Sequence, residues 1–464
     1  MIVENRTVSP TFPRRRPFFR WTANDLTPRP ERSPYLHPFI AVAALALACL
    51  ALCGCGQPRG TTQKEVIRVW SHQGQEAENA AMRAIAAAFN AAHPDHHVEL
   101  TFFPDFQYTE KLAIAAAAGD LPDAFDLDGP LVARYVDSGL LLPLDPFFDP
   151  ADLADFLPTL LRQGTVDGTL YALGAFDSAV VLYYDRALLA QAGISPPADG
   201  WNWDEFLQAC ARLKSAGIEP VALHMNESAD EWYTYAFSPV VWSGGGALIA
   251  PDGRTVRGVL SSPENVASLG QWQALFTRGF AATDPLDPDP FGNGKVAFDW
   301  TGHWMARSHL EKKGERLGAM LLPRTGAHPS APCGSWCWAI SARAREPAAA
   351  ALWLRWVTDA RHGIEPIVRA NGAVPARRSA FASFPEYEKL PYSLFRRQLE
   401  EIARPRPLTP FYASLTRGFA AALRDIARGA EVKGRLQMAE EEIDRVIRRR
   451  APRETTPNGE EGRP

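Results

Sequence analysis

Cysteine is scarce in this chain, because only six occur among 464 residues. They are Cys49, Cys53, Cys55, Cys210, Cys333 and Cys337. So few thiols exclude a disulfide framework as the main support of the fold. Cys333 and Cys337 could pair in an oxidising compartment, but buried free thiols are the simpler expectation. Neither has a histidine or carboxylate at ligand spacing beside it, so we expect no metal site and no cofactor.

An excess of positive charge is also missing. The formal net charge is -4, and the arginine-rich stretches at 14–20 and 445–453 are terminal. Proteins that bind nucleic acids need a basic face to meet the phosphates. The composition therefore argues against a nucleic-acid partner.

The common catalytic motifs are absent. The sequence has no Gly-x-Ser-x-Gly elbow and no His-Glu-x-x-His helix, and Gly244–Gly246 lacks the spacing of a nucleotide loop. Asp126 and Asp128 could suggest the acid and base of a glycosidase. They lie two residues apart on one predicted strand, however, so they point the same way and have no partner across a substrate. We therefore expect no catalytic residue.

Apolar runs long enough to span a membrane are lacking too. The run from Phe39 to Leu52 is too short for a stable spanning helix and is typical of a signal-peptide core. It ends in Leu52-Cys53-Gly54-Cys55, which resembles the lipobox of bacterial lipoproteins. That resemblance implies export and lipidation at Cys55; a core helix or an uncleaved anchor is the alternative. Residues 1–38 are then an unusual leader, disordered or upstream of the true start, and 56–64 a linker.

Behind the linker, roughly 400 residues remain, which is enough for two domains. Strands predicted at 66–70, 97–103 and 124–127 alternate with helices at 76–92, 108–118 and 131–138. Such an order favours a parallel sheet covered by helices. A second series of strands is predicted at 169–173, 180–184, 220–224 and 338–341. Its helices are predicted at 202–213, 262–277, 347–358, 392–402, 409–427 and 432–448.

The order of short motifs resembles the extracellular solute-binding proteins of ABC importers, in the carbohydrate-binding branch that includes maltose-binding protein. The matching segments are Arg68-Val69-Trp70-Ser71-His72, Gly119 to Phe125, Gly139 to Leu144, Asp167 to Leu173, Leu182 to Asp185, Trp203 to Phe206, Gly244-Gly245, Gly294 to Phe298, Thr301 to Trp304 and Val374 to Arg377. They cover about residues 65–445 in the family's order and spacing.

The resemblance implies a two-lobed α/β fold with a hinge and a ligand cleft between the lobes. Lobe I would comprise 65–174 plus 336–378, and lobe II 175–335 plus 379–448, with a disordered tail at 449–464. The chain would cross between the lobes near 172–177, 334–338 and 374–379. Closure of the lobes over a ligand would signal binding to a permease.

A sugar site needs flat aromatic surfaces for the ring and charged or amide groups for the hydroxyls. Thirteen tryptophans occur, and those at predicted strand ends or glycine-flanked turns are Trp70, Trp242, Trp300, Trp304 and Trp336. The polar candidates are His72, Glu76, Asp128, Asp177 and Arg377, of which Asp128, Asp177 and Arg377 match binding regions of the family. Burial is the alternative for any one tryptophan, and a structural salt bridge is the alternative for Arg377. Asp126 and Asp299 are weaker candidates.

The sequence thus predicts a monomeric, lipid-anchored extracytoplasmic protein that binds a carbohydrate and delivers it to an ABC permease. The alternatives are a secreted carbohydrate-active enzyme and a lipoprotein that presents a ligand to a sensor. Whether the ligand is phosphorylated stays open at this point.

Overall fold

The structure is a computed structural model that describes residues 64–198, 200–225 and 230–450. The predicted leader, the apolar segment and the lipobox-like Cys55 lie outside these residues. Among the described helices, none is both long and apolar enough to cross a membrane. The described residues belong to one compact unit and contain hydrophobic cores of their own. We therefore expect this unit to fold independently.

The first sheet has the strand order β2-β1-β3-β13-β6. Its strands are β1 (Glu65–Gln73), β2 (His96–Pro104), β3 (Ala124–Asp128), β6 (Ala172–Gly174) and β13 (Trp336–Ile340). β1 pairs in parallel with β2 and β3, which confirms the predicted parallel arrangement, whereas β13 is antiparallel to both of its neighbours. α2 (Glu76–Ala92), α3 (Asp105–Ala118) and α12 (Pro347–Val357) pack against these strands. We call the part built on this sheet lobe I.

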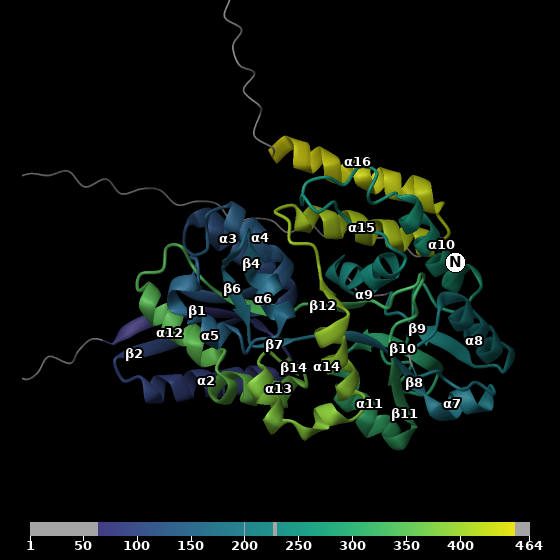
Figure 1. Ribbon diagram of the computed structural model, residues 1–464, viewed down its shortest axis with the longest axis horizontal. Coiled ribbons are helices and arrows are strands. Elements are labelled where there is room, and N and C mark those ends of the chain that lie inside the picture. Colours follow the sequence, from purple (N-terminus) through teal and green to yellow (C-terminus); the bar gives the residue numbers. More distant parts are fainter. Residues whose placement is uncertain (1–63, 199, 226–229, 451–464) are drawn as a thin grey trace, which may run out of the picture. The chain divides into compact units, whose positions relative to one another are not determined.

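The second sheet has the strand order β11-β8-β10-β9. Its strands are β8 (Val180–Asp185), β9 (Glu219–Ala222), β10 (Val296–Gly302) and β11 (Leu317–Met320). The helices of this region are α7 (Arg186–Gln191), α8 (Trp203–Ser215), α9 (Asp230–Ser243), α10 (Pro263–Thr277) and α11 (Ala306–Lys313). α8 begins with the predicted capping box between Asn202 and Glu205. We call this part lobe II, and Figure 1 shows the two sheets in separate halves of the described chain.

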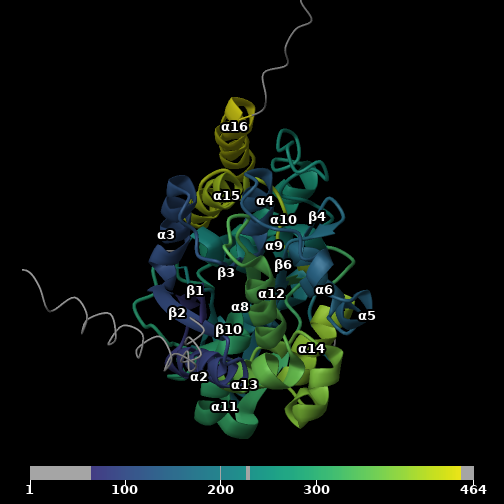
Figure 2. The same ribbon diagram turned by 90° about the vertical axis from the view of Figure 1, so that its left-hand side faces the viewer.

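The last four helices are α13 (Glu365–Asn371), α14 (Tyr392–Glu401), α15 (Tyr412–Ala427) and α16 (Val432–Arg450). α13 packs on α2 of lobe I, whereas α15 and α16 pack on α10 of lobe II. α15 packs on both α9 and α16, as Figures 1 and 2 show. Shorter elements of the described chain include α4 (Val132–Asp137), α5 (Pro150–Leu153), α6 (Pro158–Gly164), β4 (Thr165–Val166) and β5 (Thr169–Leu170).

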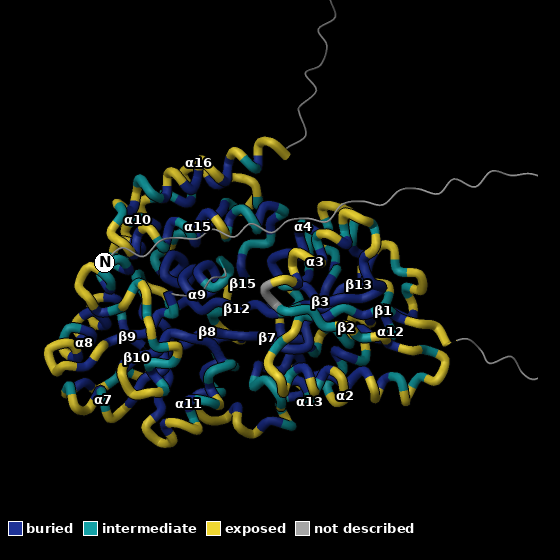
Figure 3. The backbone as a smooth tube through the Cα atoms, turned by 180° about the vertical axis from the view of Figure 1, so that it is seen from behind, coloured by how far each residue is buried: buried dark blue, intermediate teal, exposed yellow. Residues whose placement is uncertain are grey.

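Short strands lie where the chain passes from one sheet to the other. They are β7 (Phe176–Asp177), β12 (Ala331–Cys333), β14 (Val374–Pro375) and β15 (Ala403–Pro405). β7 lies between β6 of lobe I and β8 of lobe II and pairs with β14, while β12 pairs with β15 and leads into β13. The central strands of both sheets are buried, and the outer helices expose one face (Figure 3). Cys210, Cys333 and Cys337 are buried and free, as expected.

Candidate functional site

A cavity with a volume of about 620 Å³ lies between the two lobes. It is lined by His72, Gln75, Glu78, Thr109, Asp128, Phe176, Ser178, Asp230, Glu231, Tyr235, His303, Trp304, Gly334, Ser335, Trp336, Asn371 and Arg406. Its volume falls in the range of roughly 300–1,000 Å³ that small-molecule sites occupy. The cavity adjoins the carboxyl ends of β1 and β3, where open α/β sheets bind their ligands. We call it the cleft.

A flat aromatic wall borders the cleft on the side of lobe I. The imidazole of His72 stacks on the indole of Trp336, with 4.0 Å between ring centroids and 8° between planes. Asp126 holds the histidine in place, because its carboxylate lies 2.8 Å from His72 Nδ1 and accepts the His72 backbone N–H at 3.0 Å. The same carboxylate accepts the Ser71 hydroxyl at 2.7 Å. On the side of lobe II, Tyr235 and Trp304 add a second aromatic surface.

Arg406 joins the two walls through carboxylates. Its Nη1 and Nη2 donate to Asp128 at 2.8 and 2.6 Å, and Asp128 ends strand β3 of lobe I. Nη1 also donates to Glu231 on α9 of lobe II, and the Tyr412 hydroxyl donates to Glu231 at 2.6 Å. Burial alone would lower the pKa of Arg406, but the two carboxylates raise it above its usual value. Arg406 is therefore a permanently charged link between the lobes.

Beneath the cleft, Asp177 ties two crossing segments together. Its carboxylate accepts hydrogen bonds from Ser178 N at 2.8 Å, Gly334 N at 2.9 Å and Gln163 Nε2 at 3.0 Å. Full burial raises its pKa to about 6, although these donors oppose the shift. Gly334 has a φ of 141°, and a Cβ there would lie 2.6 Å from Arg406 Nη2, so no side chain fits. Asp177 is thus a support of the cleft floor.

His303 lines the cleft from the turn that follows β10. Its side chain is buried, and burial lowers the pKa of the imidazole to about 3. It is therefore neutral at physiological pH. Its Nδ1 has no hydrogen-bond partner among the described residues.

The structure brings some predicted site residues together and places others elsewhere. Those that line the cleft are His72, Asp128, Trp304 and Trp336, whereas Trp70, Glu76, Asp177, Trp242, Trp300 and Arg377 do not. Trp70 packs on Phe103 with 4.7 Å between ring centroids. Glu76 is exposed on the first turn of α2, and Glu78 on the same turn reaches the cleft instead.

The expected positions of two tryptophans were wrong. Trp300 lies inside strand β10 rather than at its end, fully buried, and its indole N–H donates to Ala236 O at 3.1 Å. Trp242 lies in helix α9 and is buried in the core, not at a strand end or in a turn. Both indoles pack inside lobe II, which is the alternative role for a tryptophan.

Arg377 forms the structural salt bridge that was the alternative to a role in ligand binding. Its Nη1 and Nη2 donate to Asp152 at 2.7 and 3.0 Å, and its Nε donates to Thr358 O at 2.7 Å. The guanidinium lies 4.0 Å from the ring centroid of Phe156. With every nitrogen of this buried fork engaged, Arg377 holds lobe I together away from the cleft.

Sequence reasoning missed the cleft residues Glu78, Asp230, Glu231, Tyr235, Asn371 and Arg406. Three of them lie on α9, which no pattern indicated, because its buried positions run continuously along the helix and Pro239, a residue that usually ends helices, lies inside it. Arg406 stands between Pro405 and Pro407 in the link between two predicted helices. An arginine held between two prolines could have indicated a functional position. Nothing in the sequence around it, however, identified its carboxylate partners.

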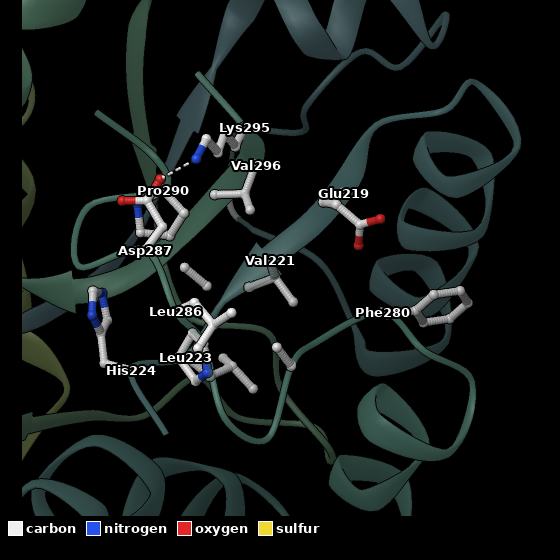
Figure 4. A pocket seen from close by; sticks show the side chains of 13 residues that line it. Glu219, Val221, Leu223, His224, Phe280, Leu286, Asp287, Pro290, Lys295 and Val296 are labelled. Atoms are coloured by element: carbon white, nitrogen blue, oxygen red, sulfur yellow. Dashed lines mark ion pairs between the residues drawn. The ribbon is translucent and has the colours of Figure 1, made fainter. Parts of the chain in front are cut away.

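A second cavity lies on lobe II alone (Figure 4). Its volume is about 190 Å³, and apolar side chains of β9 and of the loop before β10 line most of it. At its border Asp287 pairs with Lys295 at 2.7 Å, and His224 Nε2 lies 2.6 Å from the carboxylate of Asp299. Asp299 also pairs with His309 at 2.9 Å. This cavity is below the usual ligand-site range and has few polar groups that converge, so the cleft is the stronger candidate.

Residues 73–363, more than half of the chain, match the family of bacterial extracellular solute-binding proteins. The chain belongs to this family. The resemblance stated from the sequence is therefore confirmed.

The chain is also similar to curated relatives and to solved structures. The chain is 30% identical to the melibiose/raffinose/stachyose-binding protein MelE of Bacillus subtilis over 178 residues, 38% of this chain but only 40% of that protein. It is 22% identical to the maltodextrin-binding protein MdxE of Bacillus subtilis over 402 residues, 84% of this chain and 92% of the relative. The solved cyclic alpha-maltosyl-1,6-maltose binding protein from Arthrobacter globiformis superimposes with a TM-score of 0.72, covering 83% of this chain and all of that one, at 22% identity. The last likeness confirms the predicted two-lobed α/β fold.

Proposed function

We propose that this chain captures a sugar or sugar derivative in the cleft and delivers it to the permease of an ABC importer. The observation that carries the proposal is the pairing of flat aromatic walls with charged groups around one cavity between two lobes. The names of MelE, MdxE and the Arthrobacter globiformis protein, all saccharide binders, support it.

The walls suit the two kinds of surface that a pyranose presents. Its C–H faces can stack on Trp336, Trp304 and Tyr235, and its hydroxyls can bond the groups between them. Asp128 is less free than the sequence suggested, since both of its oxygens accept from Arg406. Asp128 and Arg406 would therefore act as one unit, and Asp177 would support the floor rather than touch the sugar.

The proposed location rests on the N-terminal sequence. Lipidation at Cys55 would tether the folded unit to the outer side of the cell membrane, with 56–64 as the linker. A tethered receptor stays close to the permease that accepts its ligand. The permease would dock on the closed, liganded form, with the receptor acting as a monomer.

The contacts of Asp126 and Asp128 argue against the glycosidase pair that the sequence suggested. A glycosidase needs one carboxylate free to give a proton and another free to attack or to activate water. Asp126 is buried and bonded to Ser71 and His72, and Asp128 is bonded through both oxygens to Arg406. Neither carboxylate is available for such a role in this conformation.

A ligand screen on residues 63–464 tests the proposal. Its panel holds mono- and oligosaccharides, polyols, amino acids and dipeptides, and each melting temperature is measured by differential scanning fluorimetry. At least one saccharide should raise the melting temperature, because binding to the folded state alone stabilises it by mass action. Stabilisation by amino acids or peptides but by no saccharide would contradict the proposal, as would cleavage of an oligosaccharide detected by chromatography.

A further inference from the structure

The described lining of the cleft carries an imbalance of charge. It holds the carboxylates of Glu78, Asp128, Asp230 and Glu231 and a single guanidinium, that of Arg406. Arg406 is shared between Asp128 and Glu231, so one cation serves two anions. His303 adds no positive charge, because burial lowers the pKa of its imidazole and keeps the ring neutral.

The groups just behind the lining do not correct the imbalance. Asp230 pairs with Arg424 at 2.8 Å, but Asp126 and Asp177 add two more buried carboxylates below the cleft. Asp126 faces His72 at 2.8 Å, and that imidazole lies between it and Glu78. The cleft therefore keeps an excess of negative charge at neutral pH.

Among the carboxylates of the cleft lining, Glu78 has the longest polar contacts. Asn371 Nδ2 donates to it at 3.3 Å, and His72 Nε2 lies 3.8 Å away. The Glu78 side chain is 14% exposed and lies beside the wall formed by His72 and Trp336. A cation that enters the cleft would thus meet a carboxylate and aromatic faces together, the two surfaces that bind ammonium groups best.

We infer that the cleft takes an amine-bearing saccharide, held through Glu78, and rejects saccharides that carry phosphate or carboxylate. The inference rests on the proposed function and narrows its substrate class. A protonated amine supplies the missing positive charge. Where it replaces a hydroxyl group of the sugar, it donates a charge-assisted hydrogen bond instead of a neutral one. An anionic substituent would instead stand among four carboxylates, and such like-charge contacts are the usual means of excluding a wrong ligand.

Calorimetry on residues 63–464 at about pH 6, where a sugar amine is protonated, tests the inference. The probes are matched sets that share a scaffold and differ in the charge of its substituents: glucose, glucosamine and glucuronate; cellobiose, the β-1,4 glucosamine dimer with its two amines, and cellobiouronate; and maltose with its 2-amino and uronic forms. In any set that binds, the amine should bind at least about tenfold more tightly than the neutral sugar, and the acid should bind least.

Two variants on the first turn of α2 locate the preference. Glu78→Gln should reduce the advantage of the amine over the neutral sugar to within about threefold. Glu76→Gln, the exposed control, should keep the full advantage. An acid that binds as well as the neutral sugar, an amine with no advantage, or an advantage that survives Glu78→Gln would overturn the inference and leave saccharide binding intact. If no probe binds, and amino acids or peptides but no saccharide of the wider screen stabilise the chain, the proposed function itself fails.

Discussion

Arg406 is the residue on which the two walls of the cleft depend. Its guanidinium is 4% exposed and holds Asp128 from lobe I and Glu231 from lobe II at once. Its carbon Cζ lies 5.0 Å from the ring centroid of Tyr235, so it also supports an aromatic wall. A buried ion pair adds little net stability, but removal of one partner leaves the others uncompensated.

Arg406→Ala should therefore lower the free energy of unfolding by about 3–5 kcal/mol. Urea denaturation followed by circular dichroism measures this change. Arg404→Ala, in the same short strand but exposed, is the matched control and should change stability by less than about 0.5 kcal/mol. If both variants lost the same free energy of unfolding, the carboxylates around Arg406 would not depend on its positive charge for stability.

His303 gives the cleft a pH dependence with a definite sign. Its folded-state pKa of about 3 lies below the ordinary value of 6.5, so the unfolded chain binds a proton more readily than the folded protein. The stability due to its neutral form is complete above pH 6.5 and is lost as the pH falls from there toward 3. The slope from this one group is at most about 1.4 kcal/mol per pH unit.

His303→Gln should flatten the fall in stability between about pH 6.5 and pH 4.5, relative to the parent protein. The free energies of unfolding at these two pH values are compared by urea denaturation. His328→Gln removes an exposed histidine and serves as the control. A fall of unchanged steepness in His303→Gln would show that His303 titrates normally in the folded protein.

At the scale of elements, strand β13 serves the cleft and the core at the same time. Trp336 pairs with Asp128 across the sheet and lines the cleft, while Trp338, two residues on, is 3% exposed and packs against Trp353. The buried side chain of Trp338 thus anchors the strand in lobe I and fixes the position of Trp336 in the aromatic wall of the cleft.

Alanine at these two positions should separate binding from stability. Trp338→Ala should cost about 3–5 kcal/mol of unfolding free energy, because it leaves a large cavity in the core. Trp336→Ala should cost much less and should weaken binding of the saccharide found in the screen by about tenfold or more. The comparison requires denaturation and calorimetry on both variants, and a Trp336→Ala protein with undiminished affinity would exclude this wall from the site.

Elements with a clear amphipathic pattern could be predicted from the sequence, and those without one could not. α2 occupies the predicted 76–92, and α10 begins at the predicted Pro263 behind a Ser262 cap. α9 was missed because it is buried along nearly its whole length, so no period of 3.6 residues separates a polar from an apolar face. The cleft was therefore predicted on the side of lobe I, through His72, Asp128 and Trp336, but largely missed on the side of α9.

At the scale of the described unit, the ion pair of Asp128 and Arg406 links the two lobes directly. Arg406 follows β15, which pairs with β12 rather than with the sheet that carries Asp128. Such contacts across the cleft bias the equilibrium between open and closed forms. Motif spacing could indicate that two lobes exist, but a contact between residues 128 and 406 depends on the folded arrangement.

Asp128→Ala should shift the unliganded protein toward the open form. The radius of gyration from small-angle X-ray scattering on residues 63–464 should rise relative to the parent protein. Asp120→Ala, which removes an exposed partner of Arg68, should leave it unchanged. A radius of gyration that stays constant in Asp128→Ala would show that this ion pair does not hold the lobes together.

Saccharide binding in the cleft is tested most directly by calorimetric titration of residues 63–464 with the most stabilising saccharide from the screen. The parent protein should bind one molecule per chain with a dissociation constant in the micromolar range or below, and the folded double variant Trp304→Ala Trp336→Ala should show no measurable heat of binding. Undiminished binding by the double variant would place the ligand outside the cleft and contradict the account.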